Sequence, residues 1–226
     1  DVERALFRFN CPIIDATHDL VGAFKLNIAF YEAFGAGGWY ALERTIRHIN
    51  EVAPDIPVIL DAKRGDVGNT SEQYAHAAFG YLKVDAITVS PYIGREALQP
   101  FLDRPEKGII VLCRTSNLGA DEFQDQLVVL TFSELVKLVG DPDEANALNG
   151  LMSWNYPTGG YRLPLYQYVA LRVSRHWNKH GNCGVVVGAT CPGELKQVRR
   201  IVGDMPILIP GIGAQGGDLE KIVEAG

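Results

Sequence analysis

Short apolar runs recur along the chain and alternate with longer amphipathic stretches. The runs are a few residues long, are rich in Val and Ile and lack polar alternation, which is typical of strands buried on both faces of a parallel sheet. We expect strands at residues 23–26, 57–60, 86–89, 108–112, 184–187 and 206–209. The order strand, helix, strand, helix predicts an α/β fold made of repeated β/α units.

Apolar residues at helical spacing mark the stretches between the strands. Leu42, Ile46 and Ile49 predict a helix over residues 39–52, and Tyr74, Ala78 and Tyr81 predict one over residues 72–82. An opening helix at residues 3–20 precedes the first visible strand. The pattern fits a (β/α)8 TIM barrel that is incomplete at both ends, with strands 2–7 visible. Periodicity alone leaves an open doubly wound sheet as the alternative.

The unit after the fourth apolar run is much longer than its neighbours. We interpret residues 121–161 as an insertion into a single barrel domain that spans residues 1–226. The insertion contains one expected helix at residues 133–139, a turn signal at residues 140–142 and an aromatic, Gly-rich stretch at residues 154–160. We expect its aromatic side chains to pack on the barrel wall.

Composition narrows the class of partner. The 226 residues carry a net charge of -6 without a run of like charges, so nothing favours a nucleic acid or a membrane surface over a small molecule. Four scattered cysteines lack metal or redox spacing, and we expect them to be buried thiols. No apolar stretch is long enough to span a bilayer and no signal peptide is visible, which favours the cytoplasm.

Charged side chains gather where the second apolar run ends. Asp61 and Lys63 lie two residues apart, and because side chains alternate along a strand they should point into one pocket at the catalytic end of a barrel. Asp66 follows Gly65, where the chain can turn, so it is expected to return toward Lys63 or to reach a neighbouring subunit. Lys25, on an apolar strand, needs a partner, and we expect it to be Asp61.

Glycines follow the last apolar run, at positions 211, 213, 216 and 217. Such a loop can present backbone N–H groups, and phosphate commonly binds at the loops after strands seven and eight of a barrel. Gln215 within this loop has an amide that can both donate and accept hydrogen bonds.

The amino-acid sequences of these segments resemble those of the orotidine 5'-phosphate decarboxylase family, in its bacterial branch with the Asp-Ala-Lys-Arg-Gly-Asp motif. The segments that carry the resemblance are Ala23-Phe-Lys25-Leu-Asn-Ile-Ala-Phe-Tyr-Glu32, Leu60-Asp-Ala-Lys-Arg-Gly-Asp-Val-Gly-Asn-Thr70, Cys113-Arg-Thr-Ser116-Asn-Leu-Gly-Ala120 and Pro210-Gly-Ile-Gly-Ala-Gln215-Gly-Gly-Asp218. They cover nearly the whole chain outside the insertion.

The resemblance implies a lyase that converts orotidine 5'-phosphate to uridine 5'-phosphate, the last step of UMP synthesis, without a metal or other cofactor. It implies that Lys63 stabilises the C6 carbanion and donates its proton, aided by Asp61, Asp66 and Lys25. It implies a homodimer in which Asp66 and Thr70 reach the neighbouring site. The substrate-binding residues that it implies are Thr70, Ser116, Pro210, Gly211, Gly213, Gln215 and Gly216.

Two departures from the family pattern keep other readings open. The first-strand Asp should precede residue 1, and the phosphate-binding Arg should follow Gly226, so the chain as given is expected to be feebly active or inactive. Asp15 is no substitute, because it lies in the opening helix. The alternatives are a metal-dependent sugar-phosphate decarboxylase or aldolase of similar pattern, and a non-catalytic barrel that serves as a binding module.

Overall fold

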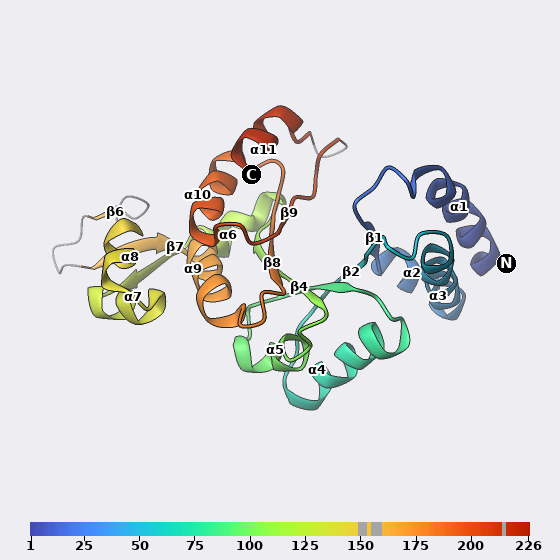
Figure 1. Ribbon diagram of the computed structural model, residues 1–226, viewed down its shortest axis with the longest axis horizontal. Coiled ribbons are helices and arrows are strands. Elements are labelled where there is room, and N and C mark those ends of the chain that lie inside the picture. Colours follow the sequence, from blue (N-terminus) through green and yellow to red (C-terminus); the bar gives the residue numbers. More distant parts are fainter. Residues whose placement is uncertain (149–152, 155–159, 214–215) are drawn as a thin grey trace. The chain divides into compact units, whose positions relative to one another are not determined.

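The computed structural model describes residues 1–148, 153–154, 160–213 and 216–226. The chain divides into two compact units, Asp1–Ile109 and Ile110–Gly226. Strands alternate with helices in both units, as the hydrophobic pattern predicts (Figure 1). A strand forms at each of the six predicted positions, with ends that shift by up to four residues.

The first unit contains a parallel sheet in the order β1-β2-β3. Its elements are α1 (Val2–Thr17), β1 (Phe24–Asn27), α2 (Ala29–Glu32), α3 (Gly35–Val52), β2 (Val58–Arg64), α4 (Gly68–Ala75), the π-helical η1 (His76–Tyr81), β3 (Ala86–Val89) and α5 (Arg95–Leu102). In the β1–β2 register, Asn27 lies opposite Asp61. The carboxyl ends of neighbouring strands therefore bring their side chains to one edge of the sheet.

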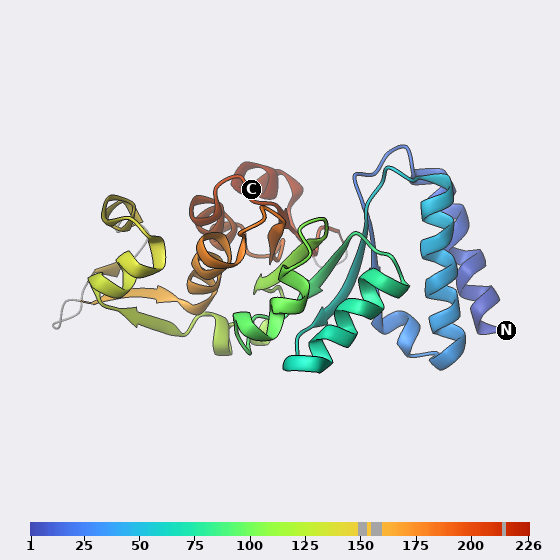
Figure 2. The same cartoon turned by 60° about the horizontal axis from the view of Figure 1, so that its bottom comes forward.

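Helix α1 packs along α3 in the first unit (Figure 2). Two side-chain contacts join them: an ion pair of Arg44 with Glu3 at 2.6 Å, and a hydrogen bond between His48 and Asp15 at 2.7 Å. Asp15 thus lies inside a helix, as expected, and pairs with a neighbouring helix. The apolar stripe of α3 that the sequence predicts is fully buried and forms part of the core.

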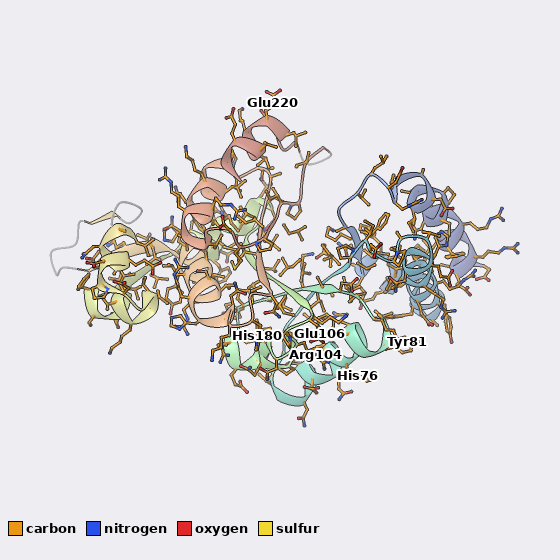
Figure 3. All side chains as sticks on the ribbon, viewed as in Figure 1. His76, Tyr81, Arg104, Glu106, His180 and Glu220 are labelled. Atoms are coloured by element: carbon orange, nitrogen blue, oxygen red, sulfur yellow. The ribbon has the colours of Figure 1, made fainter. Side chains whose placement is uncertain are left out.

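The helix predicted over residues 72–82 differs from the observed one. Helix α4 ends at Ala75 and the chain continues through the wider turns of η1, which change the direction of successive side chains. Ala78 is buried as predicted, but Tyr81 points to solvent and donates a hydrogen bond of 2.8 Å to Glu43. His76 and Tyr81 are labelled in Figure 3 on this segment.

The second unit contains strands in the order β4-β8-β9, of which β8 and β9 are parallel. Its elements are β4 (Gly108–Arg114, whose first two residues belong to the first unit), η2 (Leu118–Ala120), α6 (Asp121–Gln124), β5 (Leu127–Leu130), α7 (Phe132–Val139), α8 (Pro142–Ala147), β6 (Ser153–Trp154), β7 (Tyr161–Pro164), α9 (Leu165–Arg172), η4 (Val173–Trp177), β8 (Cys183–Val187), α10 (Pro192–Val202), β9 (Ile207–Leu208) and α11 (Leu219–Ala225).

The insertion has more regular structure than the sequence predicts. Strands β5, β7 and β6 form an antiparallel sheet, and helix α7 begins one residue before the predicted position. Thr131 caps α7 in a capping box with Glu134, and Gly140 ends it in the left-handed conformation. Most of the aromatic stretch lies outside the described residues, so its packing stays a prediction.

The sequence analysis expects all four cysteines to be buried, and the structure differs from this expectation. Cys113 and Cys183 are buried, whereas Cys11 and Cys191 are partly exposed, and all four are free thiols. Burial raises the pKa of Cys113 to about 12, which keeps that thiol protonated and unreactive. No helix within the described ranges combines the length and the apolar character that a membrane span requires.

Candidate active site

The carboxyl end of β2 departs from regular strand geometry at the charged residues. In the register with β3, Leu60 pairs with Ile87 and Arg64 pairs with Val89, so residues 61–63 lie opposite Thr88 alone. Lys63 takes a left-handed backbone conformation with φ of 49°. For a residue with a side chain, that conformation costs about 1–2 kcal/mol. The strand therefore has a strained bulge at the position where the sequence predicts catalytic residues.

Asp61 is the centre of the site and is only 9% exposed. Its Oδ1 accepts hydrogen bonds from Lys63 Nζ at 2.7 Å and from Thr88 Oγ1 at 2.9 Å. Its Oδ2 accepts from Lys25 Nζ at 3.2 Å and from Asn27 Nδ2 at 3.3 Å. The predicted contacts of Asp61 with Lys25 and Lys63 are both present. The shared pocket, however, arises from the bulge and not from the regular alternation that predicted it.

Asp61 is held in its charged form by this shell. Burial by itself raises the pKa of its carboxyl, but the hydrogen bonds from Lys63 and Thr88 and the charges of Lys25 and Lys63 outweigh burial and lower the pKa below its ordinary value. The two lysine side chains are 32% and 49% exposed. The cluster, one carboxylate between two lysines, thus presents a net positive charge to solvent.

Asp66 does not return toward Lys63. Its Oδ1 accepts from the backbone of Val67 at 2.8 Å, and its own N–H donates to Ser71 Oγ at 3.2 Å, so it holds the turn that leads into α4. It forms no ion pair with any part of the chain that the structure describes. Thr70 lies exposed in the first turn of α4. Reach to a neighbouring subunit stays a prediction for both residues.

Two residues of the shell were missed by the sequence analysis. Asn27 follows Lys25 by two positions on β1, so alternation places both side chains on the same face, and this spacing was a usable signal. Thr88 is a polar residue in a strand whose four residues are all buried. A buried hydroxyl requires a partner, but only the β2–β3 register identifies that partner as Asp61.

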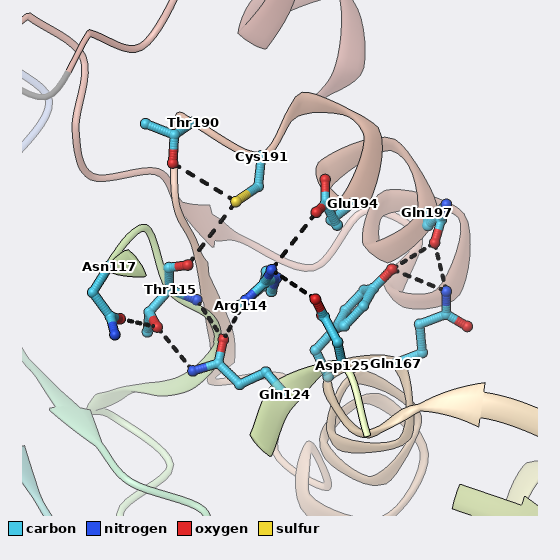
Figure 4. A network of polar contacts seen from close by, with 11 residues as sticks. Arg114, Thr115, Asn117, Gln124, Asp125, Gln167, Thr190, Cys191, Glu194 and Gln197 are labelled. Carbon is cyan, nitrogen blue, oxygen red and sulfur yellow. Dashed lines mark hydrogen bonds and ion pairs between the residues drawn. The ribbon is translucent and has the colours of Figure 1, made fainter. Parts of the chain in front are cut away.

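The carboxyl end of β4 carries a second buried charge. Arg114 is 7% exposed, and its guanidinium pairs with Asp125 at 3.1 Å and lies 3.9 Å from Glu194 (Figure 4). It also donates to Gln124 Oε1 at 3.3 Å. Residues of the insertion and of α10 are thus joined to one strand end.

The turn that carries Ser116 begins directly after Arg114. Gln124 accepts from the backbone N–H of Thr115 at 2.9 Å and donates to its hydroxyl at 2.8 Å, as Figure 4 shows. Thr115 Oγ1 donates in turn to Asn117 Oδ1 at 2.6 Å. On the other side, Gly188 packs so closely that a side chain there would collide with Ser116. The turn is therefore fixed before and after Ser116.

The Gly-rich loop of the second unit begins at Pro210, whose carbonyl accepts from Ala189 at 2.8 Å. Its Gly211, Gly213 and Gly216 have positive φ, as tight turns require. The N–H groups of Gly216 and Gly217 donate inside the loop, at 2.8 Å to Gly213 and at 3.0 Å to Gly211, so in this conformation they are not bare donors. Gln215 lies outside the described residues. Phosphate binding by the loop stays a prediction.

A cavity of about 540 Å³ lies in the first unit between α1, β1, α2 and α3. Its lining is mainly apolar, and Lys25 is the one charged side chain among the described lining residues. An anionic phosphate requires several cations or free donors. The amides of this lining are already engaged, because Asn10 donates to Tyr31 and Thr45 and Asn27 donates to Asp61. We therefore do not assign the phosphate to this cavity. The structure also contains, in its described part, no cluster of His, Cys, Asp and Glu that could hold a metal ion.

Comparison with known proteins decides the family. The family model described as orotidine 5'-phosphate decarboxylase / HUMPS matches residues 7–153. The chain belongs to this family. Among curated relatives, the orotidine 5'-phosphate decarboxylase of Cellvibrio japonicus is 46% identical over 99% of this chain and 69% of its own length. That of Ralstonia nicotianae is 48% identical over 98% and 69%.

Solved structures give the same family and its fold. The orotidine 5'-phosphate decarboxylase structure from Leishmania donovani matches 99% of this chain and 74% of its own length, with 38% identity and a TM-score of 0.78. The UMP synthase of the same organism matches with 40% identity and a TM-score of 0.81, and this chain spans 42% of its length. The predicted α/β, TIM-barrel fold class is confirmed, and the open doubly wound sheet is excluded.

Proposed function

We propose that the protein decarboxylates orotidine 5'-phosphate to uridine 5'-phosphate, the closing step of UMP synthesis in the cytoplasm. One observation carries the proposal: the family's charged strand end is present as a connected cluster, with Asp61 between Lys25 and Lys63 at 3.2 and 2.7 Å. The names of the curated relatives favour this reaction over that of a metal-dependent sugar-phosphate enzyme.

In the proposed reaction, the bond between C6 and the carboxylate breaks and carbon dioxide leaves, so the electron pair stays on C6. Lys63 stabilises this charge with its ammonium and then transfers a proton from Nζ to C6. Lys63 recovers a proton from water after product release. Catalysis without a cofactor requires preorganised charge of this kind to stabilise the carbanion.

Asp61 and Lys25 position this ammonium. The Asp61 carboxylate accepts the hydrogen bond that aims the Lys63 side chain, and Lys25 balances the carboxylate from the neighbouring strand. Because Asp61 is already bonded on both oxygens, it has little freedom to move when substrate binds. Its negative charge faces the substrate carboxylate in the proposed complex, whereas the two lysines attract the substrate as a whole.

Substrate binding is proposed to involve the second unit. Ser116, on its fixed turn, hydrogen-bonds the pyrimidine, and the loop with Pro210, Gly211, Gly213, Gln215 and Gly216 takes the phosphate. Helix termini and glycine loops bind phosphate through backbone N–H groups. The support is the positive φ of three of these glycines and the family membership of the chain.

We further propose that two chains form a dimer in which Asp66 and Thr70 reach the neighbouring site. Four apolar side chains are exposed beyond the carboxyl ends of β1, β2 and β3, which lie at one edge of the sheet: Phe30, Val67, Tyr92 and Ile93. Exposed apolar groups beside a polar site are typical of a protein interface. Asp66 lies directly before Val67, so contacts at this surface would bring it to the partner.

The direct test follows the ultraviolet change of orotidine 5'-phosphate in the presence of a chelator. The assays use the protein with the flanking segments that its relatives carry beyond the matched 69% of their length, because the chain as given is expected to be feebly active; this extended protein is called the native chain below. It is expected to turn over, and Lys63→Ala to lose about 10²- to 10⁴-fold in kcat, the range for a missing general acid. Lys179→Ala serves as the matched control, because Lys179 is exposed in the second unit. A folded native chain without turnover would overturn the proposed function.

The dimer has its own test by complementation. Lys63→Ala and Asp66→Asn chains are each expected to be nearly inactive as pure proteins. If Asp66 acts in the partner's site, a mixed dimer contains one site in which both residues are native, so mixing restores activity. Absence of restored activity in verified mixed dimers would contradict the shared site.

A further inference from the structure

Thr88 occupies an unusual place in β3. The four residues of this strand are buried, and Thr88 is the polar one among them, at 1% exposure. It faces the strained bulge of β2, where residues 61–63 lie opposite it. A valine would fit this apolar strand by size and by β propensity, so the hydroxyl requires a separate explanation.

The hydroxyl joins two parts of the bulge. It donates to Asp61 Oδ1 at 2.9 Å and accepts from the backbone N–H of Lys63 at 3.0 Å. A hydroxyl has one hydrogen to donate. Here that hydrogen is donated to the carboxylate, while a lone pair of the oxygen accepts the hydrogen bond from the amide. Both ends of the bulge are thus tied to one atom.

The left-handed backbone conformation of Lys63 requires stabilising contacts of this kind. A lysine with φ of 49° persists only where its surroundings over-determine the conformation. Within the bulge the ladder of backbone hydrogen bonds to β3 is interrupted, and the Thr88 hydroxyl takes the place of a ladder acceptor for the Lys63 N–H. Lys63 Nζ returns to the same Asp61 oxygen that the hydroxyl contacts, which closes a ring of three hydrogen bonds.

We propose that Thr88 is a positioning residue of this site, whose hydroxyl fixes the Asp61 carboxylate relative to the Lys63 backbone and so aims the Lys63 ammonium. The proposal rests on the proposed decarboxylase function, since aiming matters for the proton transfer to C6. Thr88 itself touches no reacting atom. It acts on Lys63 and Asp61, which do.

Three substitutions test this role. Thr88→Val removes the hydroxyl and keeps the shape of the side chain, whereas Thr88→Ser keeps the hydroxyl. Thr88→Ala removes the hydroxyl and the methyl group, and it serves as a second hydroxyl-free variant should the valine variant fold poorly. Thr45→Val is the matched control, because Thr45 is equally buried in the same unit and its hydroxyl donates to Ala41 within α3.

Two measurements on the substrate-free protein read the positioning directly. Carbon NMR of the Asp61 carboxyl is expected to give a higher pKa in Thr88→Val than in the native chain, because one of the hydrogen bonds that lowers it is lost. Amide hydrogen exchange at Lys63 is expected to be faster in the same variant, because the N–H loses its acceptor. Thr88→Ser and Thr45→Val should match the native chain in both.

Kinetics give the functional readout. Thr88→Val is expected to lower kcat by about 10- to 100-fold, the loss typical of one hydrogen bond to a charged group, with little change in KM. Thr88→Ser should restore most of it. An unchanged Asp61 pKa and unchanged Lys63 exchange in both hydroxyl-free variants would overturn the proposal, as would a loss of kcat that serine fails to restore. If the native chain itself does not decarboxylate the substrate, the proposed function fails, and the two NMR measurements still decide the role of Thr88.

Discussion

The carboxyl ends of β2 and β4 both hold a buried charge, but the signs and the partners differ. At β2, one carboxylate lies between two lysines whose side chains reach solvent, so the cluster has positive charge to offer. At β4, one guanidinium lies between Asp125 and Glu194, and these partners come from the insertion and from α10. The first arrangement suits binding and proton transfer to an anionic substrate. The second joins segments of the fold.

Among substitutions of the two buried charges and their surroundings, Asp61→Asn is expected to have the largest effect. This change leaves Lys25 and Lys63 without their shared counter-charge and removes the acceptor that aims Lys63. Loss of one preorganised electrostatic group typically lowers kcat by about 10²- to 10³-fold. Steady-state assays of the variant, with Asp55→Asn at an exposed position as control, measure it. Near-native turnover of Asp61→Asn would remove the distinction between the two strand ends.

Arg114→Met should act on stability and much less on chemistry. The change leaves two carboxylates without their cation, but both are partly exposed, so we expect a loss of about 2 kcal/mol in the free energy of unfolding, less than for a fully buried pair. Urea unfolding measures the loss, and kcat at saturating substrate should change by no more than about threefold. A loss of kcat like that of Asp61→Asn, at unchanged stability, would contradict the structural role of Arg114.

The pH dependence of stability should also separate the two ends. The folded pKa of Asp61 is lowered, so its contribution is fully present above the ordinary Asp pKa of about 3.9 and is lost as pH falls through the lower folded value. The stability difference between the native chain and Asp61→Asn is thus expected to be constant from neutral pH to about pH 5 and to shrink below it. Denaturant unfolding over this pH series measures the difference. A difference that grows on acidification would mean a raised pKa.

The smallest effect is expected from Gln124→Ala. Gln124 holds Thr115 by two hydrogen bonds directly before Ser116, so its loss should loosen a turn that we place against the pyrimidine. Looser positioning of a substrate contact should raise KM by about 3- to 10-fold, equivalent to one net hydrogen bond, and leave kcat nearly constant. Gln126→Ala, an exposed neighbour, is the matched control. Equal KM values in the two variants would show that Gln124 of the insertion does not support substrate binding.

Hydrophobic patterning predicted what depends on local sequence. The apolar runs identified the six strands, and the isolated charges on them identified Lys25, Asp61 and Lys63, because a charge on a buried strand requires a partner. The insertion was less predictable. Its sheet pairs residues 127–130 with residues 161–164, and such non-local pairing leaves little local signal.

The geometry of the site depended on register, which the sequence did not reveal. The left-handed Lys63 and the bulge of β2 follow from how that strand aligns with β3. The same alignment brings Thr88 to Asp61 across 27 residues of sequence. Regular alternation therefore predicted the contact of Asp61 with Lys63 for the wrong reason. For Asp66 the sequence allowed a return toward Lys63 or reach to a neighbouring subunit, and the observed turn excludes the first of these within the described chain.

The most direct test of the central claim replaces the Lys63 ammonium by chemistry. Lys63→Cys is expected to be nearly inactive, and alkylation of that thiol with bromoethylamine should restore turnover by rebuilding an ammonium at this position. Iodoacetamide, which adds a neutral amide, should not restore it, and the native chain treated with either reagent controls for its own partly exposed Cys11 and Cys191. Restoration by the ammonium alone is the predicted result. Equal turnover with either group, or near-native turnover of unmodified Lys63→Cys, would contradict the account.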